Sequence, residues 1–172
     1  MKSQGFSLLE ILIYVTFVSV IAFVFVTFSL DVLGTAQKAR VRQEVQDNLR
    51  FSMQRITQEI REANGLNVGG SAFGSHPGLL SLSMDSGAEN PTVFDVSGGV
   101  LRITQGAGAA QPLTDPNLTV SNLVFTNLSV TDRTTNIGIN LTIEHPNPEN
   151  IELFDVQLNL RSSATVREDE DQ

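Results

Sequence analysis

The sequence predicts an α+β fold, in which one long N-terminal helix packs on the antiparallel β-sheet of a globular head. Three observations support this prediction. The first 30 residues are strongly apolar, residues 31–63 lack proline and carry apolar residues at helical spacing, and several later segments alternate apolar and polar residues. A chain of 172 residues is long enough for one domain in addition to the apolar segment.

The apolar segment is long enough to be a membrane anchor. Residues 11–30 contain no charged side chain, and about 20 such residues span a bilayer as a helix. A secretory signal peptide is disfavoured because its apolar run is shorter and because no small-x-small cleavage site follows this one. The flanking charges do not set the orientation by the positive-inside rule, since Lys2 precedes the segment while Lys38, Arg40 and Arg42 follow it. We assign residues 6–30 to the transmembrane half of the long helix.

Residues 31–64 form the amphipathic half of the same helix. The charged residues Arg55 and Glu59, four apart, are expected to pair on its solvent-exposed surface, and Asn64-Gly65 is expected to end it. A helix that covers a sheet is favoured over a coiled coil. The apolar stripe that predicts this packing consists of Val41, Val45, Leu49, Met53, Ile56, Ile60 and Ala63.

Residues 65–166 are expected to form the β-sheet head, and residues 167–172 an acidic tail in solvent. Period-2 alternation predicts an antiparallel sheet with one face buried, and Ser97-Gly98-Gly99 predicts a hairpin turn. Loops are expected at residues 65–78, 106–112 and 145–150, which are rich in glycine or proline. Strands are expected at Leu79–Met84, Thr92–Val96, Val100–Thr104 and Leu118–Thr131, and in the alternating runs 137–143 and 154–160. The last of these strands is expected to end at Ser163.

Composition excludes several functions. There is no cysteine, and therefore no disulfide framework or thiolate metal site. The net charge is −8 and the basic residues are dispersed, which argues against a nucleic-acid partner. No catalytic motif is present, so we expect neither an enzyme nor a cofactor. Asp85, Glu89 and Asp95 are interpreted as scattered solvated acids rather than calcium ligands, and His76 and His145 as surface residues, so no metal is expected either.

The informative residue is Glu10, the one carboxylate at the start of the apolar segment. An acid within a membrane segment is costly and is presumed functional, with a partner of opposite charge. Glu10 stands in the run Lys2, Gly5, Phe6, Ser7, Leu8, Leu9, Glu10 and Ile11, followed by the apolar span. This run resembles the N-terminus of the type IV pilin family, which includes minor pilins and the pseudopilins of type II secretion.

The resemblance implies how the N-terminus is processed and used. Residues 1–5 would be a cytoplasmic leader that a prepilin peptidase removes by cutting between Gly5 and Phe6, with N-methylation of Phe6. Glu10 would pair with the Phe6 ammonium of an adjacent subunit, or of its own, during filament assembly. The chain departs from many family members in lacking proline between Phe6 and Ala63 and in lacking a disulfide-closed C-terminal loop. These departures favour a minor pilin or pseudopilin.

Two functions remain open. In the first, the chain is a structural subunit that is inserted in the bacterial inner membrane with its N-terminus cytoplasmic and its head outside, and is then packed into a pilus-like or type II secretion filament with other pilin or pseudopilin subunits. In the second, it is a single-pass membrane-anchored binding module whose β head recognises an envelope or surface partner. Removal of the leader distinguishes them, because a simple anchor does not need it.

Overall fold

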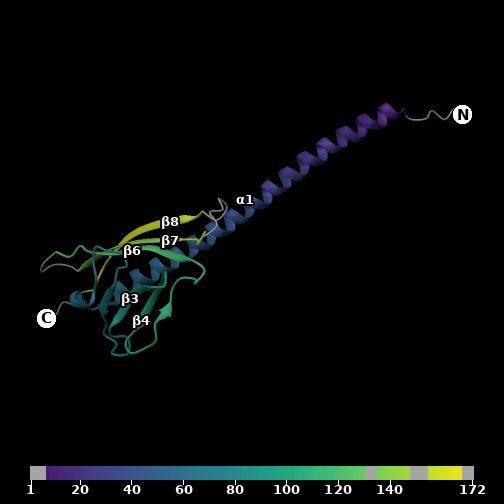
Figure 1. Cartoon of the computed structure of the whole chain (residues 1–172). Coiled ribbons are helices and arrows are strands. Elements are labelled where there is room, and N and C mark those ends of the chain that lie inside the picture. Colours follow the sequence, from purple (N-terminus) through teal and green to yellow (C-terminus); the bar gives the residue numbers. More distant parts are fainter. Residues whose placement is uncertain (1–6, 131–134, 148–154, 168–172) are drawn as a thin grey trace. The chain divides into compact units, whose positions relative to one another are not determined.

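The computed structural model describes residues 7–130, 135–147 and 155–167 (Figure 1). Its contacts divide the chain into two units, residues 1–40 and residues 41–172. One α-helix of 55 residues, α1 (Leu8–Glu62), contributes to both units. The predicted long helix is therefore confirmed, and it ends two residues before the expected Asn64-Gly65 stop.

In the first unit, α1 has no buried side chain, and its large apolar residues from Leu8 to Leu33 are all about half exposed or more. It is the one helix in the described part of the chain that is long and apolar enough to cross a membrane. The segment therefore fits a membrane span in both length and composition.

In the second unit, two antiparallel sheets follow α1, where a single sheet was expected. A 3₁₀ turn at Val68–Gly70 follows the first strand. The five-stranded sheet contains β1 (Gly65–Leu66), β2 (Leu80–Ser83), β3 (Thr92–Ser97), β4 (Val100–Gln105) and β5 (Gln111–Pro112), in that order. The three-stranded sheet contains β6 (Thr119–Asn127), β7 (Asn136–Glu144) and β8 (Gln157–Thr165), in that order.

The sheets are separate because a loop, and not β4, occupies the outer edge of β6. The Gly74 and Gly78 amides donate to the Phe125 and Leu123 carbonyls at 2.8 and 2.9 Å. A Cβ on Gly78 would lie 2.9 Å from the Leu123 oxygen, so only glycine permits this approach. Period-2 alternation specifies which face of a strand is buried, but not which strand lies beside it, and for this reason the sequence did not reveal the division.

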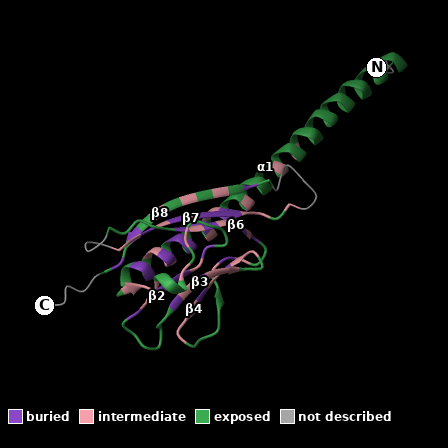
Figure 2. Ribbon diagram, turned by 60° about the vertical axis from the view of Figure 1, so that its left-hand side comes forward, coloured by how far each residue is buried: buried purple, intermediate pink, exposed green. Residues whose placement is uncertain are grey.

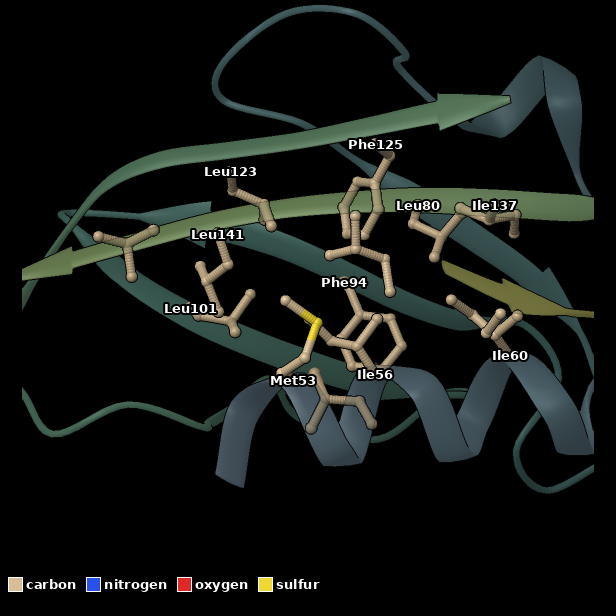
Figure 3. Close-up of a cluster of buried hydrophobic side chains, with 14 of the residues drawn as sticks. Met53, Ile56, Ile60, Leu80, Phe94, Leu101, Leu123, Phe125, Ile137 and Leu141 are labelled. Atoms are coloured by element: carbon tan, nitrogen blue, oxygen red, sulfur yellow. The ribbon is translucent and has the colours of Figure 1, made fainter. Parts of the chain in front are cut away.

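A single hydrophobic core joins α1 to both sheets (Figure 3). The predicted stripe is buried from Val45 to Ile60 on α1 and at Ala63 directly after it, and Val41 packs at its margin. Figure 2 shows the buried residues gathered where α1 lies beside the strands, and few along the rest of the helix. The sheets contribute Leu80, Leu82, Phe94, Leu101 and Ile103 from one side, and Leu123, Phe125, Ile137, Ile139, Leu141 and Ile143 from the other.

Most predicted strands are confirmed, with shifted ends. The β3–β4 hairpin turns at Gly98 and Gly99, whose φ angles of 60° and 79° suit glycine. Strand β6 ends at Asn127 rather than at Thr131, which lies outside the described residues. Strand β8 begins at Gln157, later than the alternating run that starts at Phe154, and it ends at Thr165, two residues beyond the expected end at Ser163. Phe154 lies outside the described residues.

The prediction that Glu59 lies on the solvent-exposed surface is wrong. Its side chain is 2% exposed and forms the expected ion pair with Arg55, at 2.6 Å. Burial raises the pKa of Glu59, the Arg55 charge lowers it, and the nearby Glu62 and Glu89 raise it further. The i, i+4 spacing correctly predicted the Arg55–Glu59 pair. It did not reveal that Glu59 is buried when the rest of the head packs on the helix.

Candidate functional site

The predicted processing residues Gly5 and Phe6 lie outside the described residues, whereas Glu10 lies within them. Glu10 is exposed in the first turn of α1. A carboxylate is favoured at that position because the unpaired amides of a helix N-terminus carry a partial positive charge. No other described residue forms a hydrogen bond or ion pair with its side chain, so the structure leaves its carboxylate available.

The surroundings of Glu10 on α1 are apolar. Its side chain borders an open hollow of about 330 Å³ along the helix, whose other lining residues are Ser7, Leu9, Ile13, Tyr14 and Phe17. A group that packs against this side of α1 would therefore contact one carboxylate, that of Glu10, surrounded mainly by aliphatic and aromatic side chains.

The serine and threonine hydroxyls between residues 11 and 30 do not need an external partner. Thr16, Ser19 and Ser29 each donate to the carbonyl four residues earlier, at 2.7 to 2.8 Å, and Thr27 donates to the Phe23 and Val24 carbonyls. Such back-bonding satisfies polar side chains inside a helix in lipid. Glu10 is the only residue between Ser7 and Leu30 that is charged at neutral pH, and it has no such local partner.

The acids considered for calcium binding are not brought together. Asp95 forms a two-point pair with Arg102 across the β3–β4 hairpin, with the Nε–Oδ1 bond at 2.9 Å. The Asp85 carboxylate accepts a hydrogen bond from the side-chain Nδ2 of Asn64. No group of three or more potential metal ligands occurs among the residues that the structure describes.

The two histidines have structural surroundings. His76 is exposed, as predicted for a surface residue, but its Nδ1 accepts a hydrogen bond from the Leu123 amide at 2.9 Å. It thereby joins the glycines of its loop in covering the outer edge of β6. His145 is half-buried at the end of β7, and its amide donates to the Val156 carbonyl at 3.0 Å.

A groove between α1 and β8, which the sequence did not predict, has a volume of about 500 Å³. Met53 and Leu160 give it an apolar floor, and Arg50 and Arg61 are its two basic residues. The two arginines are eleven residues apart, which places them on one face of a helix after about three turns. The spacing of the two arginines was visible in the sequence, but the sequence did not show that β8 lies beside them. The remaining lining residues are Gln54, Thr57, Gln58 and Glu62.

Comparison of the chain with protein-family models, curated proteins and solved structures finds no match.

Proposed function

We propose that this chain is a structural subunit of pilin type, a minor pilin or pseudopilin, that assembles through α1 into a pilus-like or type II secretion filament. The observation that carries the proposal is the isolation of Glu10. It is the one charged side chain in the exposed apolar segment of α1 from Leu8 to Leu30, where the serine and threonine hydroxyls are bonded within the helix. When lipid or neighbouring helices bury a carboxylate that lacks a local partner, pairing with a cation from another chain is favoured.

The external cation in this proposal is the N-terminal ammonium of Phe6 on a neighbouring subunit, produced by cleavage after Gly5 and retained after N-methylation. Two charges attract weakly in water but by several kcal/mol where lipid or packed helices exclude it. Because either charge alone is costly in that environment, the pair favours the one register in which they meet. The exposed apolar residues of α1 would first contact lipid in the inner-membrane precursor and then neighbouring helices in the filament.

Processing is tested by intact-mass measurement and N-terminal sequencing of the membrane-extracted protein from cells that contain an active prepilin peptidase. We expect a chain that begins at Phe6 and carries one added methyl group. A chain that still begins at Met1 would overturn the assignment.

The assembly role of Glu10 is tested separately by replacing it with alanine. We expect Glu10→Ala to leave the head folded, because residues 41–172 form the core without it, and to abolish incorporation into filaments. Thr16→Ala, in the same apolar segment but outside the hollow, is the matched control and should assemble normally. Normal incorporation of Glu10→Ala would refute the pairing argument.

The alternative function is a membrane-anchored binding module, with the head as its recognition element. The groove between α1 and β8 is the specific observation that favours it. A precursor that is never cleaved, and whose location does not depend on Glu10, would support this alternative. The two functions are compatible, since a filament subunit can also present a binding head.

A further inference from the structure

The outer edge of β8 carries unpaired backbone groups. Within the described residues, strand β8 pairs only with β7, with Asn136 opposite Thr165 and Glu144 opposite Gln157. At the two ends of this ladder the Val166 amide donates to Thr135 and the Val156 carbonyl accepts from His145. Directly opposed residues of an antiparallel pair exchange their hydrogen bonds at alternate positions, so the even-numbered residues of β8 are bonded to β7.

The odd-numbered residues of β8 therefore direct their amides and carbonyls outward. None of these groups has a partner among the residues that the structure describes, and all five side chains are exposed (Figure 2). An open edge of this length is a template on which another extended chain can add a strand. The residues concerned are Gln157, Asn159, Arg161, Ser163 and Thr165.

The groove lies where the inward side chains of an added strand would go. Leu160, an even-numbered residue of β8, lines it together with α1. A strand hydrogen-bonded to the outer edge of β8 would extend the three-stranded sheet over this side of α1, and every second side chain would point into the groove. The edge would hydrogen-bond the backbone of the added strand, and the groove would determine which side chains that strand can carry.

The chemistry of the groove specifies the added strand. Arg50 and Arg61 are separated by about 16 Å along α1, Met53 lies between them in sequence, and Leu160 of β8 is the other apolar residue of the lining. Two inward positions of a strand, i and i+4, are about 13 Å apart, and arginine side chains are long enough to span the difference. Neither arginine has an ion pair within the described residues, in a chain whose net charge is −8. The one acid of the groove, Glu62, accepts a hydrogen bond from Gln58 at 2.9 Å, so the two arginines outnumber it. Acidic side chains at i and i+4 with an apolar one at i+2 complement this groove.

We propose that the edge of β8 and its groove bind an extended segment of a different protein, with carboxylates at i and i+4 and an apolar residue at i+2. A second copy of this chain does not fit. Outside α1, the only acids four apart are Asp85 and Glu89, and Gly87 lies between them in a turn. Symmetric pairing of two β8 strands about their centre would also set Arg161 against Arg161. This proposal does not depend on pilin-type assembly, and its test does not involve processing or Glu10.

The test uses the full chain in detergent micelles and a synthetic twelve-residue peptide. One face of the peptide carries glutamate, valine and glutamate at i, i+2 and i+4, and the other face carries threonine. Its control has glutamine in place of both glutamates. We expect the glutamate peptide to slow amide hydrogen exchange at the odd-numbered residues of β8, and the control to bind about tenfold more weakly. No slowing at a saturating concentration, or equal binding of the two peptides, would overturn the proposal.

Two pairs of variants locate the binding. The double variant Arg50→Glu, Arg61→Glu should bind the glutamate peptide at least about tenfold more weakly than the wild type. Arg42 is exposed on α1 outside the groove, so Arg42→Glu should leave the affinity for the peptide unchanged. Ser163→Pro removes an outward amide and should abolish binding while β7 stays paired. Ser162→Pro removes an amide that β7 uses and should disrupt the sheet itself. Self-association that Ser163→Pro abolishes would assign the edge to a second copy and overturn the choice of partner.

Discussion

Replacement of Ile56 by alanine should destabilise the head strongly, because this side chain joins α1 to the core. Ile56 is 0% exposed and lies beside Met53 and near Phe94 in the cluster between the helix and the sheets (Figure 3). Truncation of a fully buried isoleucine to alanine costs about 2–5 kcal/mol, through lost transfer free energy and the cavity that remains. For a unit the size of residues 41–172, a loss of 3 kcal/mol lowers the melting temperature by about 10 °C.

The matched control is Phe51→Ala on the same helix. Phe51 is the larger side chain, but it is 57% exposed. Its removal should change the free energy of unfolding by less than about 0.5 kcal/mol, as for most surface substitutions, and alanine is the better helix former.

Both variants are measured as the full chain in detergent micelles. Amide hydrogen exchange of β7 reports the free energy of opening the head without a contribution from the apolar half of α1. An equal cost for Ile56→Ala and Phe51→Ala would refute the inference that one stripe of α1 holds the helix to the sheets.

Two further predictions concern the region where α1 ends. Glu59→Gln should change the pH dependence of stability. Because burial raises the pKa of Glu59 above the ordinary 4.5, the native state binds its proton more tightly, and the wild type should lose stability relative to the variant as pH rises above that value. Urea midpoints at pH 4 and pH 7 check this, and a constant difference between the two proteins would contradict it. Gly106→Ala should be strongly destabilising, because φ is +53° and a Cβ would lie only 2.2 Å from the Ala88 oxygen, whereas Gly87→Ala meets no atom and should be tolerated. Thermal melts of the two variants separate these outcomes.

The sequence predicted the parts of the fold that depend on local periodicity. The α1 stripe from Val45 to Ile60 and the alternation of β7 each follow from a repeat that matches one secondary structure. The Gly98-Gly99 turn was predictable for a similar reason, since both residues need positive φ.

The features that the sequence did not predict depend on which segments become neighbours. The C-terminal half of β8 reads Arg161, Ser162, Ser163, with no apolar alternation, because an edge strand is only partly covered. Its backbone pairing with β7 extends the strand beyond the expected end, to Thr165. The burial of Glu59 also depends on packing from residues distant in sequence.

Much the same holds for the candidate sites. Glu10 was identifiable because a charge in an apolar segment is anomalous within its own sequence window. The groove between α1 and β8 was not, since Arg50 and Arg61 resemble ordinary surface residues until Leu160 is placed beside them.

The loop on β6 determines how many partners the three-stranded sheet can accept. One side of the sheet is closed by Gly74, His76 and Gly78, and the other is open along β8 (Figure 1). A sheet with two open sides can grow without limit, since each added chain exposes a new edge for the next head. With one side closed, β8 of one head cannot pair with β6 of another, so copies of this chain cannot propagate a continuous sheet. The three-stranded sheet therefore offers one edge to which a strand can be added, and this limits edge-to-edge aggregation through that sheet.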